Sequence, residues 1–129
     1  MRFARWVFLL AGVSGVVMVL PLYLEDRFFR DDPPAINRPE FYYGFVGVTL
    51  AWQALFLVIA SDPVRYRGAM LPAMLEKASF AAAVPLLYAA GRVAAVWLGF
   101  ASLDATWLVL FAVAYLRTPR QLPEKGEKA

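Results

Sequence analysis

Four long apolar blocks, separated by short polar segments, restrict what this chain can fold into more than any motif it contains. They lie at about residues 3–24, 41–60, 78–99 and 101–117. A helix needs ~20 apolar residues to cross the hydrocarbon core of a bilayer. The fourth block is short for this, and local thinning of the bilayer or snorkelling of Arg117 would accommodate it. We therefore predict an all-α, polytopic membrane protein with an up-down-up-down bundle of four transmembrane helices.

The composition agrees with a membrane protein and excludes several kinds of chemistry. Hydrophobic residues make up 61% of the chain, against ~45–50% in soluble domains. There is no cysteine and no histidine, so thiolate nucleophiles and imidazole bases or ligands are excluded. We assign no catalytic residue, no metal ligand and no cofactor. Basic residues stand at the ends of blocks, without interleaved aromatics, and we expect no nucleic-acid partner.

The segments around the blocks have distinct expected roles. The first block has the basic start of a secretory signal, but its apolar run is longer and lacks small residues at cleavage-site spacing. We expect an uncleaved first span. Residues 25–40, with three prolines, are expected to form a solvated outer loop, or a lid if Phe28 and Phe29 dip into the membrane. The tail, 119–129, is expected to be disordered.

The segment SDPVRYRGAMLPAMLEK, residues 61–77, is the most motif-like part of the chain. Its charged and apolar residues are spaced as in a short helix lying in the membrane interface. The apolar face would consist of Met70, Leu71, Met74 and Leu75. The basic residues Arg65, Arg67 and Lys77 would meet anionic headgroups. An alternative is a plain connector held at the membrane by its charges.

The distribution of lysine and arginine predicts the orientation of the chain. With four spans, both termini and segment 61–77 share one side of the membrane. That side carries nine basic residues: Arg2, Arg5, Arg65, Arg67, Lys77, Arg117, Arg120, Lys125 and Lys128. The other side carries three: Arg27, Arg30 and Arg38. Cytoplasmic loops are the richer in basic residues, so we predict cytoplasmic termini (N-in, C-in) in a bacterial inner membrane.

Arg92 is an arginine inside the apolar run LLYAAGRVAAVW, residues 86–97. If the third and fourth spans turn around residues 98–100, Arg92 lies level with Asp104, and charges inside membranes usually pair. Tyr88 stands one helical turn below Arg92. Gln53 is the strongly polar side chain of the second block, and its amide is expected to bond a neighbouring helix. The candidate polar pocket is Arg92, Asp104, Tyr88, Gln53 and Trp97. Snorkelling of Arg92 to the headgroups is the alternative.

The layout of residues 3–117 resembles small four-helix bacterial inner-membrane proteins of the DoxX-like type. The resemblance rests on the four apolar blocks, on PEFYYGF at 39–45, where the second block begins, and on DPVRYRGAMLPAMLEK at 62–77. It implies an architecture only, and no site residue is taken from it.

Three functions remain open on these grounds. The first is a non-catalytic bundle that binds an apolar or lipid-like ligand, a partner membrane protein or a second copy of itself. The second is a quinone-binding or redox-complex subunit, with the ring near Tyr88, Arg92 and Trp97. The third is a transporter or channel subunit. The absence of catalytic motifs favours the first.

Overall fold

The computed structural model describes residues 2–24 and 39–121, and this part of the chain is helical without strands. The elements are α1 (Arg2–Val19), η1 (Leu20–Leu24), α3 (Pro39–Ser61), η2 (Arg67–Ala69), α4 (Met70–Ala89) and α5 (Val96–Arg117). Four segments are long and apolar enough to cross a membrane: Arg2–Leu24, Pro39–Ser61, Arg67–Ala89 and Val96–Arg117. The predicted all-α fold with four spans is confirmed.

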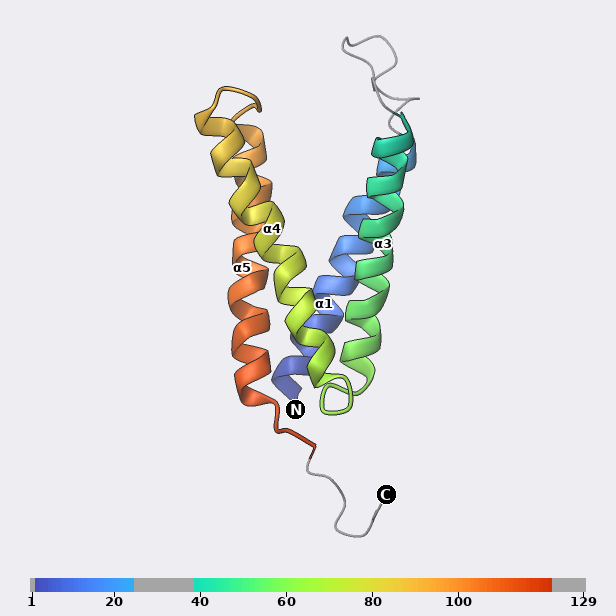
Figure 1. The fold of residues 1–129 in the computed structure, drawn as a ribbon. Helices are drawn as coiled ribbons and strands as arrows, with labels where there is room; N and C mark the ends of the chain where they lie inside the picture. The colour runs from blue at the N-terminus through green and yellow to red at the C-terminus, as the bar shows by residue number, and fades with distance from the viewer. Residues whose placement is uncertain (1, 25–38, 122–129) are drawn as a thin grey trace, which may run out of the picture.

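The four helices form two antiparallel hairpins, α1–α3 and α4–α5, that meet at one end and diverge toward the other (Figure 1). We call the end where α1 begins and α5 ends the closed end, and the opposite end the open end. Helix α3 makes little contact with α4, whereas the two helices within each hairpin pack along their length. The bundle is therefore a V rather than a closed cylinder.

Three phenylalanine rings from three helices hold the closed end together. Phe8 of α1 stacks on Phe111 of α5 with ring centroids 4.3 Å apart, and Phe56 of α3 meets Phe111 edge-on at 5.0 Å. All three side chains are fully buried. Small buried residues around them allow the backbones to approach: Ala4, Ala11, Ala60, Ala73 and Ala114. Lipid tails are as apolar as side chains, so close packing rather than water exclusion joins membrane helices.

The α1–α3 hairpin depends on two glycines that admit side chains of α3. A Cβ at Gly12 would lie 2.7 Å from Cδ2 of Leu57, and one at Gly15 would overlap the Gln53 side chain. Gln53 is buried there and donates from Nε2 to the Thr49 carbonyl of its own helix at 3.0 Å. The expected amide bond to a neighbouring helix is therefore replaced by a bond within α3.

The connector differs from the expected interfacial helix over 61–77. Residues 62–66 form a turn in which the Asp62 side chain accepts from the Arg65 amide at 3.2 Å. After η2, the chain enters α4 at Met70, which is fully buried in the core of the closed end. Leu71 and Leu75 are exposed, because they lie on the outer face of a spanning helix. The expectation of a separate interfacial helix is wrong.

The third span ends ten residues earlier than the apolar pattern indicates. Gly91 has a φ of +71°, its amide donates to the Tyr88 carbonyl, and the Arg92 amide donates to that of Leu87, both at 2.9 Å. This is a Schellman motif, which ends a helix at a left-handed residue that is usually glycine. The third span is thus 67–89 rather than 78–99, and the fourth starts at Val96 rather than 101. Arg92 lies in the turn, and Lys77 lies well inside a helix.

Two other expectations concern regions outside the described residues. Of the predicted outer loop, 25–40, the last two residues belong to α3, and the rest, with Phe28 and Phe29, lies outside the described part. Residues 119–121 of the tail are non-helical, and 122–129 are likewise outside it.

Replacing Phe111 by alanine should lower the free energy of unfolding by about 3 kcal/mol, since truncating a buried phenylalanine typically costs about 3–5 kcal/mol. Leu116→Ala, on the same helix but with 78% of its surface exposed, should change it by less than about 0.5 kcal/mol. Unfolding in mixed micelles titrated with denaturing detergent measures both. Equal losses would show that the aromatic contact does not hold the closed end.

Candidate functional site: an ion cluster at the floor of the cleft

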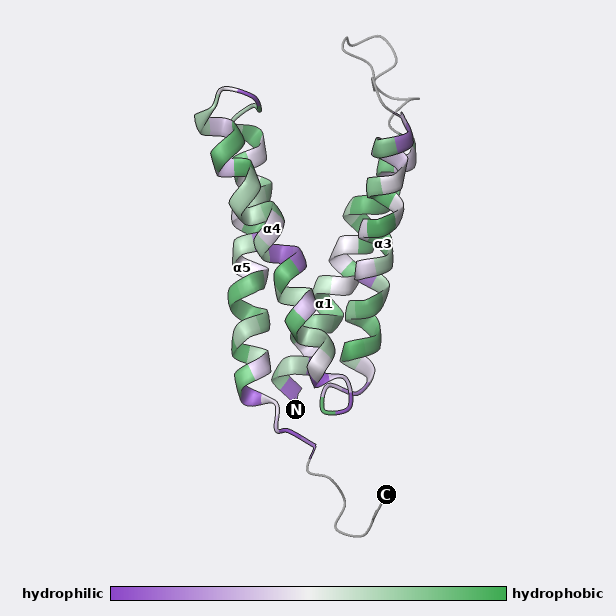
Figure 2. Cartoon of the chain, viewed as in Figure 1, coloured by the Kyte–Doolittle hydropathy of each residue, from purple (hydrophilic) through white to green (hydrophobic). Residues whose placement is uncertain are grey.

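Lys77 lies about halfway along the span formed by η2 and α4. It follows Arg67 by ten residues, or about 15 Å at ~1.5 Å per helical residue, half of a ~30 Å hydrocarbon core. Figure 2 shows a hydrophilic segment midway along α4, between stretches of apolar helix. An ionisable group at such a depth is costly and is by default a functional candidate. The sequence pattern places Lys77 at the membrane interface; because the candidate span begins earlier, at Arg67, Lys77 lies ten residues inside it.

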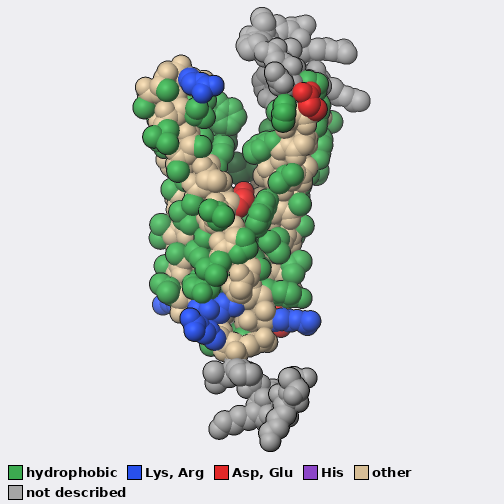
Figure 3. Space-filling model, viewed as in Figure 1, with side chains coloured by type: hydrophobic (Ala, Val, Ile, Leu, Met, Phe, Trp, Pro, Cys, Tyr) green, Lys and Arg blue, Asp and Glu red, His purple; other side chains and the backbone are tan. Residues whose placement is uncertain are grey.

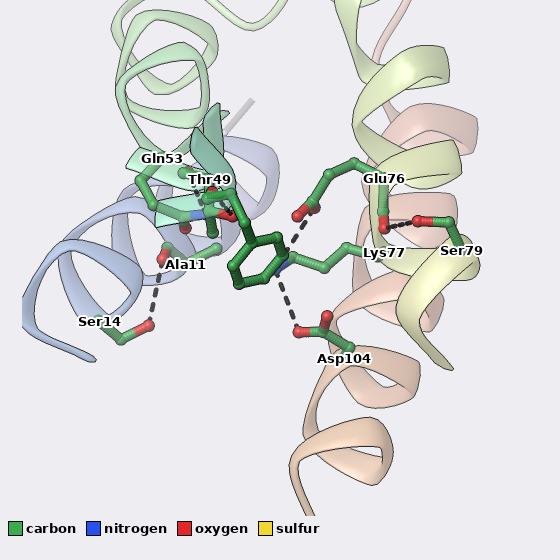
Figure 4. Close-up of polar contacts among 9 residues, drawn as sticks. Ala11, Ser14, Thr49, Gln53, Glu76, Lys77, Ser79 and Asp104 are labelled. Carbon is green, nitrogen blue, oxygen red and sulfur yellow. Dashed lines mark hydrogen bonds and ion pairs between the residues drawn. The ribbon is translucent and has the colours of Figure 1, made fainter. Parts of the chain in front are cut away.

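The Lys77 ammonium is paired with two carboxylates and covers an aromatic ring. Nζ donates to Oδ1 of Asp104 on α5 at 3.1 Å and lies 3.5 Å from Oε2 of Glu76 (Figure 4). It also lies 5.4 Å from the centroid of the Phe56 ring, within reach of a cation–π contact. The ammonium thus links α4 to α5 and touches α3 of the other hairpin.

The three charged side chains are mostly withdrawn from the surface. Exposed fractions are 9% for Lys77, 16% for Glu76 and 19% for Asp104. Oε2 of Glu76 is buried and accepts no hydrogen bond from the described residues. We call Glu76, Lys77 and Asp104 the ion cluster. With two carboxylates and one ammonium, it has one negative charge in excess when all three are ionised.

The ion cluster lies where the two hairpins separate. Figure 3 shows a notch between them, apolar on both sides, with an acidic side chain visible near its base. We call this notch the cleft and the ion cluster its floor. Below the floor, Phe56 belongs to the packed core of the closed end. Away from the ends of the described spans, the charged side chains are therefore concentrated at this one depth.

The chemistry available at the floor is that of binding and charge balance. Carboxylates accept hydrogen bonds and attract cations, and the lysine donates. Among the described residues no group of three or more metal-ligating side chains occurs. The ion cluster can therefore hold a polar group of a ligand whose apolar part lies against the cleft walls.

The structure does not assemble the pocket that the sequence predicts. Asp104 pairs with Lys77 and not with Arg92, whose side chain is exposed in the turn. Tyr88 and Trp97 are each nearly half exposed near this turn, and Trp97 packs on Phe100. The physical reason is the early end of α4 at Gly91, which carries these residues to the open end. Gln53 is buried between α1 and α3 instead.

The two arginines expected at the interface do lie at the closed end, in different environments. Arg65 is exposed. Arg67 donates from Nε to the Thr118 carbonyl at 2.7 Å and lies 3.8 Å above the Tyr115 ring. Arg67 therefore fastens the start of the third span to the end of the fourth.

Glu76 is the site residue that sequence reasoning missed, together with the pairing of Lys77. A signal was present: Gly91 after an alanine-rich run is a possible helix stop. Counting a span backward from Gly91 would have placed Glu76 and Lys77 at mid-depth rather than at its start.

Comparison with known proteins adds no assignment: the chain matches no protein-family model, no curated protein and no solved structure. The candidate site therefore rests on the geometry of the ion cluster and the cleft.

The Lys77–Asp104 pair should appear in a double-mutant cycle made in a Glu76→Gln background, where these two residues are the only charges of the ion cluster. Lys77→Met or Asp104→Leu alone should cost about 3–5 kcal/mol of unfolding free energy, because each leaves a buried charge unpaired. The double replacement should recover most of that loss.

Arg92→Leu is the matched control for this cycle, since its exposed side chain should contribute less than about 0.5 kcal/mol. Combined with Asp104→Leu, its effect should simply add. Additive losses for Lys77 and Asp104 would instead show that they do not form a pair in the membrane.

Proposed function

We propose that this small multi-pass membrane protein is a non-catalytic binding protein that holds an apolar or lipid-like ligand in the cleft between its hairpins. One observation carries the proposal: an ion cluster with a buried lysine and two partly buried carboxylates forms the floor of a cleft with apolar walls. Ligand sites are typically concave and mostly apolar, with a few polar groups that fix orientation.

The cost of charges inside a membrane supports a ligand that covers the floor. A charged side chain at the centre of a span costs ~2.5–3.5 kcal/mol on the insertion scale. Lys77 and Asp104 satisfy each other in part, yet Oε2 of Glu76 has no hydrogen-bond donor among the described residues. An amphiphile whose polar group reaches the floor would supply a donor there and shield the charges from lipid tails.

The other candidates have less support. A quinone near Tyr88, Arg92 and Trp97 would lie at the open end, since Tyr88 is about 16 Å along α4 from Lys77. A transporter or channel subunit would need access to the floor from both ends, and the packed rings of Phe8, Phe56 and Phe111 separate it from the closed end. A partner membrane protein that inserts a helix into the cleft remains the main competitor of a small ligand.

We further propose that the closed end faces the cytoplasm of a bacterial cell and that the cleft opens toward the outer leaflet of the inner membrane. Among the described residues, the closed end has six arginines: Arg2, Arg5, Arg65, Arg67, Arg117 and Arg120 (Figure 3). In the described ranges, the open end has one, Arg92. This asymmetry favours the predicted orientation. The resemblance to DoxX-like proteins is compatible with it and remains a prediction.

Reporter fusions test the orientation. Green fluorescent protein fused to the C-terminus should fluoresce, and alkaline phosphatase at the same position should be inactive. Fusions truncated after Ala95, in the turn of the open end, should give the reverse result. A phosphatase-active C-terminus would overturn both the orientation and the side to which we assign the cleft.

Mass spectrometry of the protein released from native membranes tests ligand binding. The wild type and the control Arg92→Leu should retain a defined amphiphile near equimolar amount. The triple variant Glu76→Gln, Lys77→Met, Asp104→Leu should retain about tenfold less, a difference of ~1.4 kcal/mol, because it lacks the charged floor. Uncharged replacement of buried ion pairs is often tolerated, so the variant should stay folded.

Identical lipid profiles for all three proteins would contradict the binding proposal. A stoichiometric second protein lost only from the triple variant would replace the small ligand by a membrane-protein partner.

A further inference from the structure

The charge of the ion cluster defines the class of ligand more narrowly than the apolar walls do. We propose that the cleft selects a lipophilic amine, a molecule with an apolar body and an ammonium group that carries N–H donors. This rests on the proposed function, which places a ligand with its polar group at the floor. Three features of the floor favour this class of ligand: its charge balance, the free acceptor on Glu76, and the bond that Lys77 already donates to Asp104.

The charge balance of the ion cluster favours a cationic ligand. When ionised, Glu76 and Asp104 together carry one more charge than Lys77 neutralises. In the described part of the chain, Lys77 is the only cation in ion-pair contact with either carboxylate. Surroundings of low dielectric strengthen the attraction between such a cluster and a further cation. A ligand with one positive charge would make the floor neutral.

The free acceptor on Glu76 favours a ligand with hydrogen-bond donors. Its Oε2 atom is buried and accepts no hydrogen bond from the described residues, since Lys77 Nζ, at 3.5 Å, is in ion-pair contact only. In Figure 4 the Glu76 carboxylate points away from the α4 axis toward α3. Hydrogen bonds between an ammonium and a carboxylate are about twice as strong as neutral ones. An N–H group of the ligand would donate a hydrogen bond to this Oε2 atom.

The ammonium of Lys77 is already bound, which disfavours anionic ligands. It donates to Asp104 at 3.1 Å and faces the Phe56 ring. A phosphate or carboxylate headgroup would compete with Asp104 and Glu76 for this ammonium while approaching two negative charges. A neutral alcohol could donate to Glu76, yet it would leave the excess charge in place. An ammonium group would both donate to Glu76 and neutralise the excess negative charge.

Three probes of nearly the same shape separate these possibilities: 1-adamantylammonium, 1-adamantanol and 1-adamantanecarboxylate. Each is titrated calorimetrically into the full-length protein in nanodiscs of zwitterionic lipid, with empty nanodiscs as the blank. We expect the ammonium to bind at least about tenfold more tightly than the alcohol, a difference of ~1.4 kcal/mol. The carboxylate should bind more weakly than both.

Glu76→Gln tests the acceptor with little change of shape, and it leaves the Lys77–Asp104 pair in place. It should weaken ammonium binding at least about tenfold and leave alcohol binding within about twofold. Glu40→Gln is the matched control, because Glu40 is exposed at the start of α3 and its replacement should change neither affinity. Should Glu76→Gln fail to fold, the order of the three probes on the wild type decides alone.

Equal affinities for the ammonium and the alcohol, tighter binding of the carboxylate, or no binding of any probe would each overturn the selection of an amine. The proposed function is tested separately, by mass spectrometry of the protein released from native membranes. If an amphiphile is retained there by the wild type and lost from the triple variant while the probes show no preference for the ammonium, ligand binding stands and only its charge class is wrong.

Discussion

The contact among Phe8, Phe56 and Phe111 is the constraint on which the rest of the structure depends. It joins α1 and α3 to α5 of the other hairpin, whereas α3 and α4 make little contact (Figure 1). Between membrane helices there is no water to exclude, so association requires surfaces that fit closely. Rings surrounded by alanines provide such a fit at the closed end. Beyond them the fit ends, and the hairpins separate.

The ion cluster lies at the upper limit of this contact, and its position has two consequences. Lys77 covers Phe56 while it pairs with Asp104, so one ammonium touches both hairpins. The same position leaves Glu76 facing the space where the helices part. Burying three charges costs more stability than an apolar replacement would. Their presence at one depth is the feature on which the proposed binding role rests.

The end of the third helix shows why part of the site was not predictable from hydropathy. The run from 78 to 99 is almost uniformly apolar, because the residues of the turn, apart from Gly91 and Arg92, are alanines and a valine. A glycine spaced four residues from an alanine indicates close helix packing, and a glycine after a helix indicates its end. Sequence spacing does not distinguish the two. The positive φ of Gly91 does, and the shift of ten residues moved Lys77 from the expected interface to mid-depth.

The sequence by itself determined the helical class, the four spans and the concentration of arginine at one end, because these follow from hydropathy, length and charge along the chain. It also restricted the chemistry, since no cysteine or histidine occurs. Only the tertiary structure decided that Asp104 pairs with Lys77 rather than Arg92, that Glu76 joins them, and that the hairpins part above Phe56. Those facts depend on which helix faces meet and at what depth, and such contacts between distant residues have no signature in local composition.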